Sequence, residues 1–426
     1  MRVIHFADLH IGVDTFGRPM SDRGWSSRMQ DFLDAFDELV AFAIENTADA
    51  VVFAGDAYKA REPTQTHQRE FARRVRQLSE AGIATFLLVG NHDLPNAEGR
   101  AHALEIFRTL DVPNVYVGDN AWFAQNGFVP QVMQTRSGPL QVAFIPWPQV
   151  SRLVANDPEA ASASIDQLHR IVEGKLADLI AKQAAALDPA LPAVLTCHIS
   201  LNEAIVRNRP GSEQFMTVGT APTLLKSQLQ EACFDYIALG HHHNNVDLGL
   251  QTPCWYSGSL QAVDFGEEGQ PKGFMVFDID PAMPRGERVY GAGLPRLVNV
   301  QARRFVTVEV APRDADPTAE VCRAIEKAEV ANSIVRVHIN LSPEQQSLFR
   351  LPEARRLLDS AHYVAALRVI LPNDPRPSLP AGQAPSADPV QALDLFFRNK
   401  AYEDARRERL LAAARDLVAV TGEPGA

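Results

Sequence analysis

The sequence lacks several features that would place it in other classes of protein. It has only four cysteines in 426 residues (Cys197, Cys233, Cys254 and Cys322), without a CxxC pair. This excludes a zinc ribbon or a disulfide framework and fits a reducing compartment. No apolar run is long enough to span a bilayer, and the opening MRVIHFADLH lacks the basic and apolar regions of a signal peptide. We therefore expect a cytoplasmic protein.

Positive charge is also scarce. Lysine and arginine number 41 against 52 aspartates and glutamates, a net charge of −11. Such a chain binds nucleic acid only through local basic patches or bound cations. The densest basic run of the first 280 residues, HQREFARRVRQ (Arg69, Arg73, Arg74, Arg76), is better explained as a solvated helix face than as a DNA contact. No GxxxxGK[ST] occurs, so any use of ATP through a P-loop requires a partner.

The first two thirds of the chain alternate short apolar runs with stretches of helical periodicity. The runs are RVIHFA, DAVVFAG, ATFLLVG, QVAFIP, AVLTC and DYIALG, and helices are predicted over residues 28–46 and 64–80. This alternation predicts a layered α/β domain over residues 1–280, with helices covering a sheet that ends near residue 280.

The last third has a different organisation. Three strand-like runs, FVTVEVA, SIVRVHINL and YVAALRVILP, with helical segments at 318–329 and 343–360, predict a small α+β domain over residues 298–372. Residues 373–389 are rich in proline and predict a linker. Residues 390–421 predict amphipathic helices that either fold back on the body or bind a groove on another protein. Their apolar positions are Val390, Leu393, Phe397, Leu410, Ala414, Leu417 and Val418.

Polar side chains follow the apolar runs wherever these end. They are Asp8 and His10, Asp56, the trio Asn91, His92 and Asp93, His198, and the run His241, His242 and His243. We expect them to converge at the carboxyl edge of one sheet, where α/β folds bind ligands. A mixed oxygen and imidazole set suits manganese, iron or zinc better than calcium. The set is large enough for two metals that share a bridging carboxylate.

Each motif alone has a simpler explanation. DLH, GD and GNHD are compatible with strand-end turns, GHHH with a surface histidine cluster, and a lone buried histidine with a satisfied core residue. Turn chemistry does not explain their joint occurrence at successive strand ends. The glycines before Asp56, Asn91 and His241 allow tight turns and close backbone approach.

In this order, D-x-H, G-D, G-N-H-D, H and G-H-x-H resemble the motifs of the calcineurin-like metallophosphoesterases. Three longer segments narrow the resemblance to the SbcD exonucleases, the nuclease subunits of the bacterial SbcC–SbcD complex. These segments are DLHIG, FDYIALGHHH and WYSGSLQAVDFGEEGQPKGF. The resemblance implies an α/β fold: a layered β-sandwich nuclease domain with flanking helices, a small α+β cap that binds DNA, and C-terminal helices.

The resemblance also implies roles for individual residues. Two divalent metal ions, most simply Mn²⁺, would share Asp56 as a bridging ligand. His92 would contact the scissile phosphate or leaving group, Asp93 would orient His92, and His242 would face away. The remaining ligands would be Asp8, His10 and His243 at the first metal, and Asn91, His198 and His241 at the second.

The implied function is a metal-dependent nuclease of DNA repair, recombination and replication. It would be a 3′–5′ double-strand exonuclease and a hairpin or single-strand endonuclease, acting as a homodimer within a heterotetramer. An SbcC-type ATPase would bind the C-terminal helices around Leu393, Phe396, Phe397, Leu410 and Leu417. The alternatives are a small-molecule or nucleotide phosphodiesterase on the same metal centre, and a non-catalytic DNA-end clamp, which would lack a ligand or His92.

Overall fold

The computed structural model describes residues 1–95, 99–155, 157–201 and 222–371, with 390, 393–394, 397 and 404–421. The chain divides into two compact units, which are residues 1–308, 322–337 and 351–367, and residues 309–321, 338–350 and 368–426. The predicted linker at 373–389 and Phe396 lie outside the described residues.

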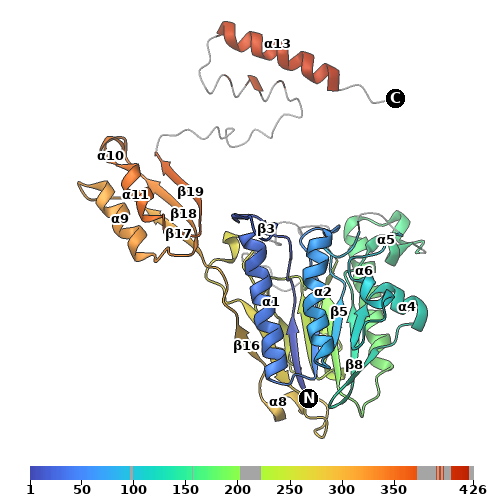
Figure 1. Cartoon of the computed structure of the whole chain (residues 1–426). Coiled ribbons are helices and arrows are strands. Elements are labelled where there is room, and N and C mark those ends of the chain that lie inside the picture. The colour runs from blue at the N-terminus through green and yellow to red at the C-terminus, as the bar shows by residue number, and fades with distance from the viewer. Residues whose placement is uncertain are drawn as a thin grey trace. The chain divides into compact units, whose positions relative to one another are not determined.

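Two six-stranded sheets form the body of the first unit (Figure 1). The first has the order β16-β15-β1-β4-β5-β6, in which β1, β4, β5 and β6 pair in parallel and β15 pairs antiparallel with both of its neighbours, β1 and β16. Its strands are β1 (Arg2–Phe6), β4 (Ala50–Phe53), β5 (Ala84–Leu88), β6 (Val115–Gly118), β15 (Gly273–Asp278) and β16 (Arg296–Asn299).

The second sheet has the order β13-β14-β12-β9-β8-β7, with β8, β9, β12 and β14 parallel. The strands are β7 (Gln131–Thr135), β8 (Gly138–Ile145), β9 (Ala193–His198), β12 (Tyr236–Gly240), β13 (Val246–Asp247) and β14 (Cys254–Tyr256). Two short ribbons complete the strands of this part: β2 (Pro19–Met20) with β3 (Trp25–Ser26), and β10 (Ser200–Leu201) with β11 (Thr223–Leu224).

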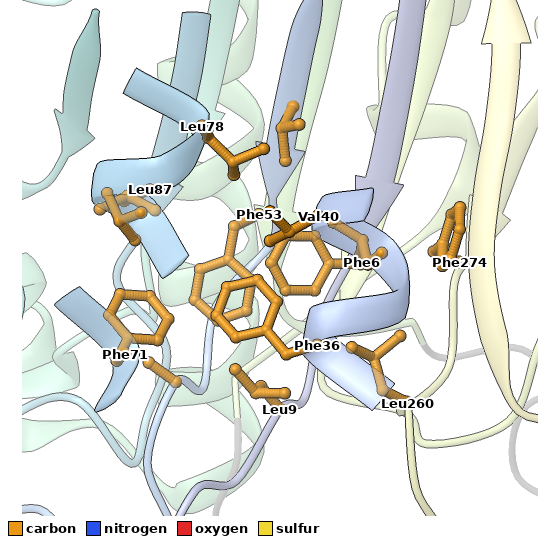
Figure 2. Close-up of a cluster of buried hydrophobic side chains, with 14 of the residues drawn as sticks. Phe6, Leu9, Phe36, Val40, Phe53, Phe71, Leu78, Leu87, Leu260 and Phe274 are labelled. Atoms are coloured by element: carbon orange, nitrogen blue, oxygen red, sulfur yellow. The ribbon is translucent and has the colours of Figure 1, made fainter. Parts of the chain in front are cut away.

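The central strands are buried on both faces, which explains why they read as continuous apolar runs. On one face of the first sheet, Phe6 and Phe53 pack against Phe36 of α1 (Ser27–Glu45), and Phe71 of α2 (Gln65–Glu80) lies beside them (Figure 2). On the other face, a second cluster joins the two sheets. It contains Val3, Val52 and Phe86 from the first sheet and Phe144, Val194 and Ala238 from the second.

Further helices lie around the sheets. Helix α6 (Ile165–Ala185) packs through Val172, Leu176 and Ile180 onto Leu195 and Ile237 of the second sheet. The shorter helices of this part are α3 (Glu105–Thr109), α4 (Asn120–Asn126), α5 (Val150–Val154) and α8 (Arg288–Ala292). The fold is therefore a sandwich of two mixed sheets flanked by helices, as the family resemblance implied.

Two details of the sequence prediction are wrong. The strands that end in polar residues belong to two sheets rather than one, with β9 and β12 in the second. The first sheet also does not end near residue 280, because the chain returns after α8 and β16 pairs antiparallel with β15. This pairing adds an edge strand that the predicted boundary had left outside the sheet.

A three-stranded sheet of order β17-β18-β19 follows, with strands β17 (Phe305–Val310), β18 (Ile334–Asn340) and β19 (Tyr363–Ile370). Helix α9 (Pro317–Lys327) matches the prediction. The helical segment predicted over 343–360 is divided into two helices, α10 (Pro343–Leu348) and α11 (Leu351–Leu357). Pro352 explains the break, because a proline within a continuous helix removes one hydrogen bond and clashes with the preceding turn.

Near the C-terminus, α13 (Asp404–Thr421) includes the predicted apolar positions Leu410, Ala414, Leu417 and Val418. Leu410 is substantially exposed, whereas its neighbour Leu411 is buried. Within the described residues, no helix combines the length and apolar composition needed to cross a membrane.

Candidate metal centre

The candidate site is built from loops that follow strands of both sheets. Asp8 and His10 follow β1, Asp56 follows β4, and Asn91, His92 and Asp93 follow β5. His198 ends β9, and His241 and His243 follow β12. Backbone hydrogen bonds join the first two loops, from Asp8 N to the Gly55 carbonyl (2.9 Å) and from His10 N to the Asp56 carbonyl (3.1 Å). The structure therefore brings all nine predicted site residues into one buried cluster.

The first predicted ligand set forms a compact group. Candidate ligand atoms of Asp8, His10 and His243 lie within 4.8 Å of one another, and all three residues are buried. The Nε2 atoms of His10 and His243 are 2.9 Å apart. Two imidazole nitrogens that point at each other beside a carboxylate are a fitting arrangement for a divalent cation.

The second predicted set centres on the side-chain oxygen of Asn91. Asn91 Oδ1 lies 3.0 Å from His198 Nε2 and 3.3 Å from His241 Nδ1. An amide oxygen is also a metal ligand, so the three side chains converge as a second site requires.

Asp56 lies between the two groups. Its Oδ2 atom is 3.8 Å from His10 Nε2 and 3.4 Å from His198 Nε2. This buried oxygen accepts no hydrogen bond from the described residues, whereas Oδ1 accepts the His92 backbone N–H at 2.8 Å. A buried carboxylate oxygen without a hydrogen bond fits a bridging position between two cations. The donors present therefore fit a two-metal centre.

The backbone at the site is strained. Asp8, His10, Asp56 and His241 all have positive φ values, 52°, 47°, 64° and 98°. Residues other than glycine rarely adopt this region, and such strain is concentrated at functional sites. All four residues lie in the loops that carry the candidate ligands.

Two of the predicted glycines leave space for site residues. A Cβ on Gly55, whose φ is +101°, would lie 2.4 Å from His198 Nδ1, and one on Gly90 would lie 2.2 Å from Asp56 Oδ1. Both contacts are far shorter than van der Waals distance, so any side chain would displace a candidate ligand. The expectation that these glycines permit close approach is confirmed.

The carbonyl oxygen of Ala54 fixes the orientation of His198. This carbonyl lies 2.7 Å from His198 Nδ1. Because a carbonyl can only accept, Nδ1 carries a proton, and Nε2, which faces Asn91 and Asp56, is the nitrogen that a metal would bind after that nitrogen loses its proton. Such a partner on the other ring nitrogen is typical of metal-ligating histidines.

The buried charges of the site shift the pKa values of its aspartates and of His198. Burial, together with Asp56, raises the pKa of Asp8 to about 6. Burial alone would raise the pKa of Asp56, but His198 and other nearby histidines hold it well below its usual value. Burial would also lower the pKa of His198, yet Asp56 raises it to about 9. Two bound cations would neutralise the buried carboxylates, as protonated histidines do in the protein without metal.

His92 and Asp93 divide their roles differently from the prediction. The His92 ring lies edge-on to His10, 4.9 Å between centroids, and its Nδ1 is 2.7 Å from the carbonyl oxygen of Lys59. The Asp93 carboxylate instead accepts backbone N–H groups of Gly90, Asp56 and Ala57 at 2.9–3.0 Å. The expectation that Asp93 orients His92 directly is wrong. A main-chain carbonyl does so, and Asp93 ties the two ligand-bearing loops together.

The structure adds one aromatic residue that the sequence analysis missed. Trp147 lies just beyond β8, with its ring centroid 4.9 Å from His241 and 6.0 Å from His198. Its position after another apolar strand, QVAFIP, was the available signal. His242 is edge-on to Tyr256 at 4.8 Å and belongs to none of the metal-capable groups found among the described residues.

The basic run in α2 is engaged by acidic groups. Glu70 bonds Arg69, Arg73 and Arg74, and Arg76 pairs with Glu80. Arg74 also pairs with Asp37. Arg69, Arg73 and Arg76 are exposed, which agrees with a solvated helix face, whereas Arg74 and Glu70 are buried.

Comparison with known proteins identifies relatives of the chain. A family model described as calcineurin-like phosphoesterase matches residues 1–245. The SbcD component of the SbcCD nuclease of Bacillus subtilis is 27% identical over 285 residues, 66% of this chain and 67% of that protein. The corresponding protein of Escherichia coli K12 is 23% identical over 64% of this chain and 63% of that protein.

An archaeal protein is more similar over a shorter region. "DNA double-strand break repair protein Mre11" of Halobacterium salinarum is 37% identical over 137 residues, 30% of this chain and 32% of that protein. The alignment thus spans about a third of this relative's length. Because the family model matches more than half of the chain and the site carries buried histidine and aspartate clusters that can hold metal, the chain belongs to the calcineurin-like phosphoesterases.

Proposed function

We propose that the chain is the nuclease component of an SbcC–SbcD-type complex, which hydrolyses DNA phosphodiesters at a two-metal centre. The observation that carries the proposal is Asp56, whose buried Oδ2 lies between the His10 and His198 sides of the site. Similarity to SbcD proteins over about two thirds of the chain supports DNA as the substrate.

In this proposal Asp8, His10 and His243 would hold the first metal, Asn91, His198 and His241 would hold the second, and Asp56 would be shared by both. When bound, two such cations lower the pKa of a water and stabilise the entering and leaving oxygens of an in-line displacement. The preferred metal is Mn²⁺, which accepts this mixture of carboxylate, amide and imidazole ligands.

The protein supplies a further group through His92. The Lys59 carbonyl accepts a hydrogen bond from the N–H of His92 Nδ1. Nε2 is therefore the atom that contacts the scissile phosphate or, when protonated, donates a proton to the leaving 3′ oxygen. The proposed activities are 3′–5′ exonuclease action on duplex ends and endonuclease action on hairpins and single strands.

Cleavage of end-labelled linear duplex DNA by the purified chain tests this proposal. Lanes with Mn²⁺, Mg²⁺ and EDTA run beside an Asn91→Ala control and a small chromogenic phosphodiester. Progressive shortening with Mn²⁺ that disappears with EDTA and in the variant supports the nuclease. Turnover of the small ester with intact DNA, unchanged by an added SbcC-type ATPase and ATP, favours a nucleotide phosphodiesterase. No turnover of either favours a DNA-end clamp.

The proposed partner is an SbcC-type ATPase in the cytoplasm, bound by the C-terminal helices of a homodimeric nuclease. We expect deletion of residues 388–426 to abolish this complex in size-exclusion chromatography. DNA cleavage by the isolated chain should remain largely intact. An undiminished complex would show that the helices belong to the body of the protein.

A further inference from the structure

A buried ion pair lies behind the first ligand group. It comes from the segment WYSGSLQAVDFGEEGQPKGF, in which Glu267 and Lys272 have side chains that are 0% and 2% exposed. Lys272 Nζ lies 2.5 Å from Glu267 Oε2. Removing two charges from water is costly, and a hydrophobic pair of similar volume is often as stable. The pair therefore calls for a role other than stability.

The two oxygens of Glu267 have different partners. Oε1 accepts from His243 Nδ1 at 2.8 Å. Oε2 accepts from Lys272 and lies 3.3 Å from both Ser259 Oγ and the backbone nitrogen of Val263. One oxygen thus contacts the candidate ligand, while the other anchors the carboxylate to the protein.

Lys272 holds the same histidine by a second route. Its Nζ donates to the backbone carbonyl of His243 and to Ser259 Oγ, both at 2.9 Å. The side chain of His243 is therefore held by Glu267 and its backbone by Lys272. A small movement of either group would shift the ring.

The contact with Glu267 also decides which nitrogen of His243 is available. An ionised carboxylate only accepts hydrogen bonds, so Nδ1 carries the proton and Nε2 presents its lone pair. That Nε2 faces His10 Nε2 at 2.9 Å, within the group that includes Asp8.

We propose that Glu267 is a positioning residue for the first metal: it fixes the ring and the tautomer of His243, and Lys272 holds Glu267 in place. The inference rests on the proposed two-metal function. Carboxylates bonded to ligating histidines raise ligand basicity, and their loss typically lowers metal affinity about 10–100-fold.

The chain offers a matched control one residue away. Glu268 follows the short turn η4 (Phe265–Glu267), and its carboxylate accepts from the backbone nitrogen of Thr307 at 2.7 Å and from the Thr307 hydroxyl. Glu268→Gln removes the same charge from the same turn. Its hydrogen bonds are to Thr307 and leave the contact between Glu267 and His243 in place.

The test is a titration of the full chain with Mn²⁺, with free Mn²⁺ measured by electron paramagnetic resonance. Wild type should bind two ions, and so should Glu268→Gln with unchanged affinities. In Glu267→Gln one site should weaken about 10–100-fold while the other stays unchanged. Thermal melts of the metal-free chains report whether each variant is folded.

Glu267→Gln leaves the Lys272 charge buried without its partner, which can unfold the protein. The double variant Glu267→Leu, Lys272→Met removes both charges together with the acceptor for His243 Nδ1. A folded double variant should show the same selective loss at one site. Wild-type affinity at both sites in either folded variant, or an equal loss in Glu268→Gln, would overturn the inference.

The metal titration also separates this inference from the proposed function. If wild type binds two Mn²⁺ ions and Glu267→Gln weakens one but DNA is not cleaved, the positioning role stands and the nuclease proposal fails. If wild type binds fewer than two ions, the two-metal proposal fails and this inference fails with it.

Discussion

The two halves of the candidate metal centre are held in different ways. His198 is oriented by a main-chain group, the carbonyl of Ala54, 2.7 Å from Nδ1. His243 is oriented by a side chain, the carboxylate of Glu267, 2.8 Å from Nδ1. Both contacts leave Nε2 available to a metal. A main-chain contact survives substitution of the residue that supplies it, and the sequence does not reveal it. A side-chain contact is lost when its residue is substituted, and it requires a particular residue type in the sequence.

The halves should therefore be sensitive to different changes. The His198 half depends on space, because a Cβ on Gly55 would lie 2.4 Å from Nδ1. The His243 half depends on charge, because Glu267 and Lys272 are both buried. Added volume should break the first half, and removed charge should break the second. Substitutions at each half can test this difference.

The largest expected effect comes from Asp56→Asn, because Asp56 lies between both halves. Loss of the bridging charge removes several kcal/mol of transition-state stabilisation, so DNA cleavage should fall by at least about 10³-fold. Mn²⁺ should also bind weakly at both sites. Cleavage rates and Mn²⁺ titration measure this, with the exposed Asp22→Asn as control. A variant that keeps one full-affinity site would show that Asp56 serves only one half.

His92→Ala should lower the rate of DNA cleavage and leave metal binding at both halves of the centre unchanged. His92 is held by the Lys59 carbonyl and is proposed as a proton donor rather than a ligand. Cleavage should fall about 10²–10⁴-fold, the usual contribution of acid–base catalysis. Metal analysis should still find two ions per chain. A fall to about one ion would place His92 among the ligands, as its proximity to His10 and Asp56 allows.

Gly55→Ala tests the half that depends on space. The new methyl group would collide with His198 and place alanine at a φ of +101°. We expect a loss of about 1–3 kcal/mol in unfolding free energy from backbone strain, with weaker binding of one Mn²⁺ ion. The control is Gly82→Ala, which has a φ of +71° but nothing within 4 Å of the added atom. Unchanged Mn²⁺ affinity in Gly55→Ala would contradict the steric account.

The smallest expected effect comes from Asp119, a buried carboxylate that, like Glu267, pairs with a basic residue but contacts no candidate metal ligand. Asp119 caps α4 through the Trp122 N–H (2.9 Å) and bonds His102 and Arg108. Burial alone would raise its pKa, but these hydrogen bonds hold the pKa below the usual value. A lowered pKa stabilises the fold above the unfolded value of about 4 and loses this contribution as the pH falls further.

Asp119→Asn should therefore cost about 1 kcal/mol at pH 7, because the amide still caps α4 but lacks the negative charge that His102 and Arg108 contact. The difference from wild type should shrink as the pH falls below about 4. Urea unfolding at pH 7 and pH 3 measures both values, and Mn²⁺ affinity serves as the control because it should not change. A difference that grows in acid would mean that the folded-state pKa of Asp119 is raised rather than lowered.

The sequence predicted the parts of the site that follow from strand-end chemistry. Asp8, Asp56 and His243 lie where an apolar run ends, and the structure brings them together. The sequence could not show that β9 belongs to a second sheet, because strands buried on both faces give the same continuous apolar pattern in either sheet.

Other features were missed because their signals were weak or absent. The Lys59 carbonyl that holds His92 leaves no trace, since every residue has a carbonyl group. Asp93 was placed beside His92 by sequence proximity, yet its carboxylate meets main-chain nitrogens of two loops. Glu267 lies in the segment WYSGSLQAVDFGEEGQPKGF, but His243 is 24 residues away in the sequence, and no sequence pattern indicates that the two side chains meet.

The most direct test of a two-metal centre bridged by Asp56 is a crystal of the Mn²⁺-loaded protein measured at the manganese absorption edge. We predict two anomalous peaks, one beside Asp8, His10 and His243 and the other beside Asn91, His198 and His241. Both peaks should contact Asp56. A single peak, or two peaks of which neither contacts Asp56, would contradict the bridged centre.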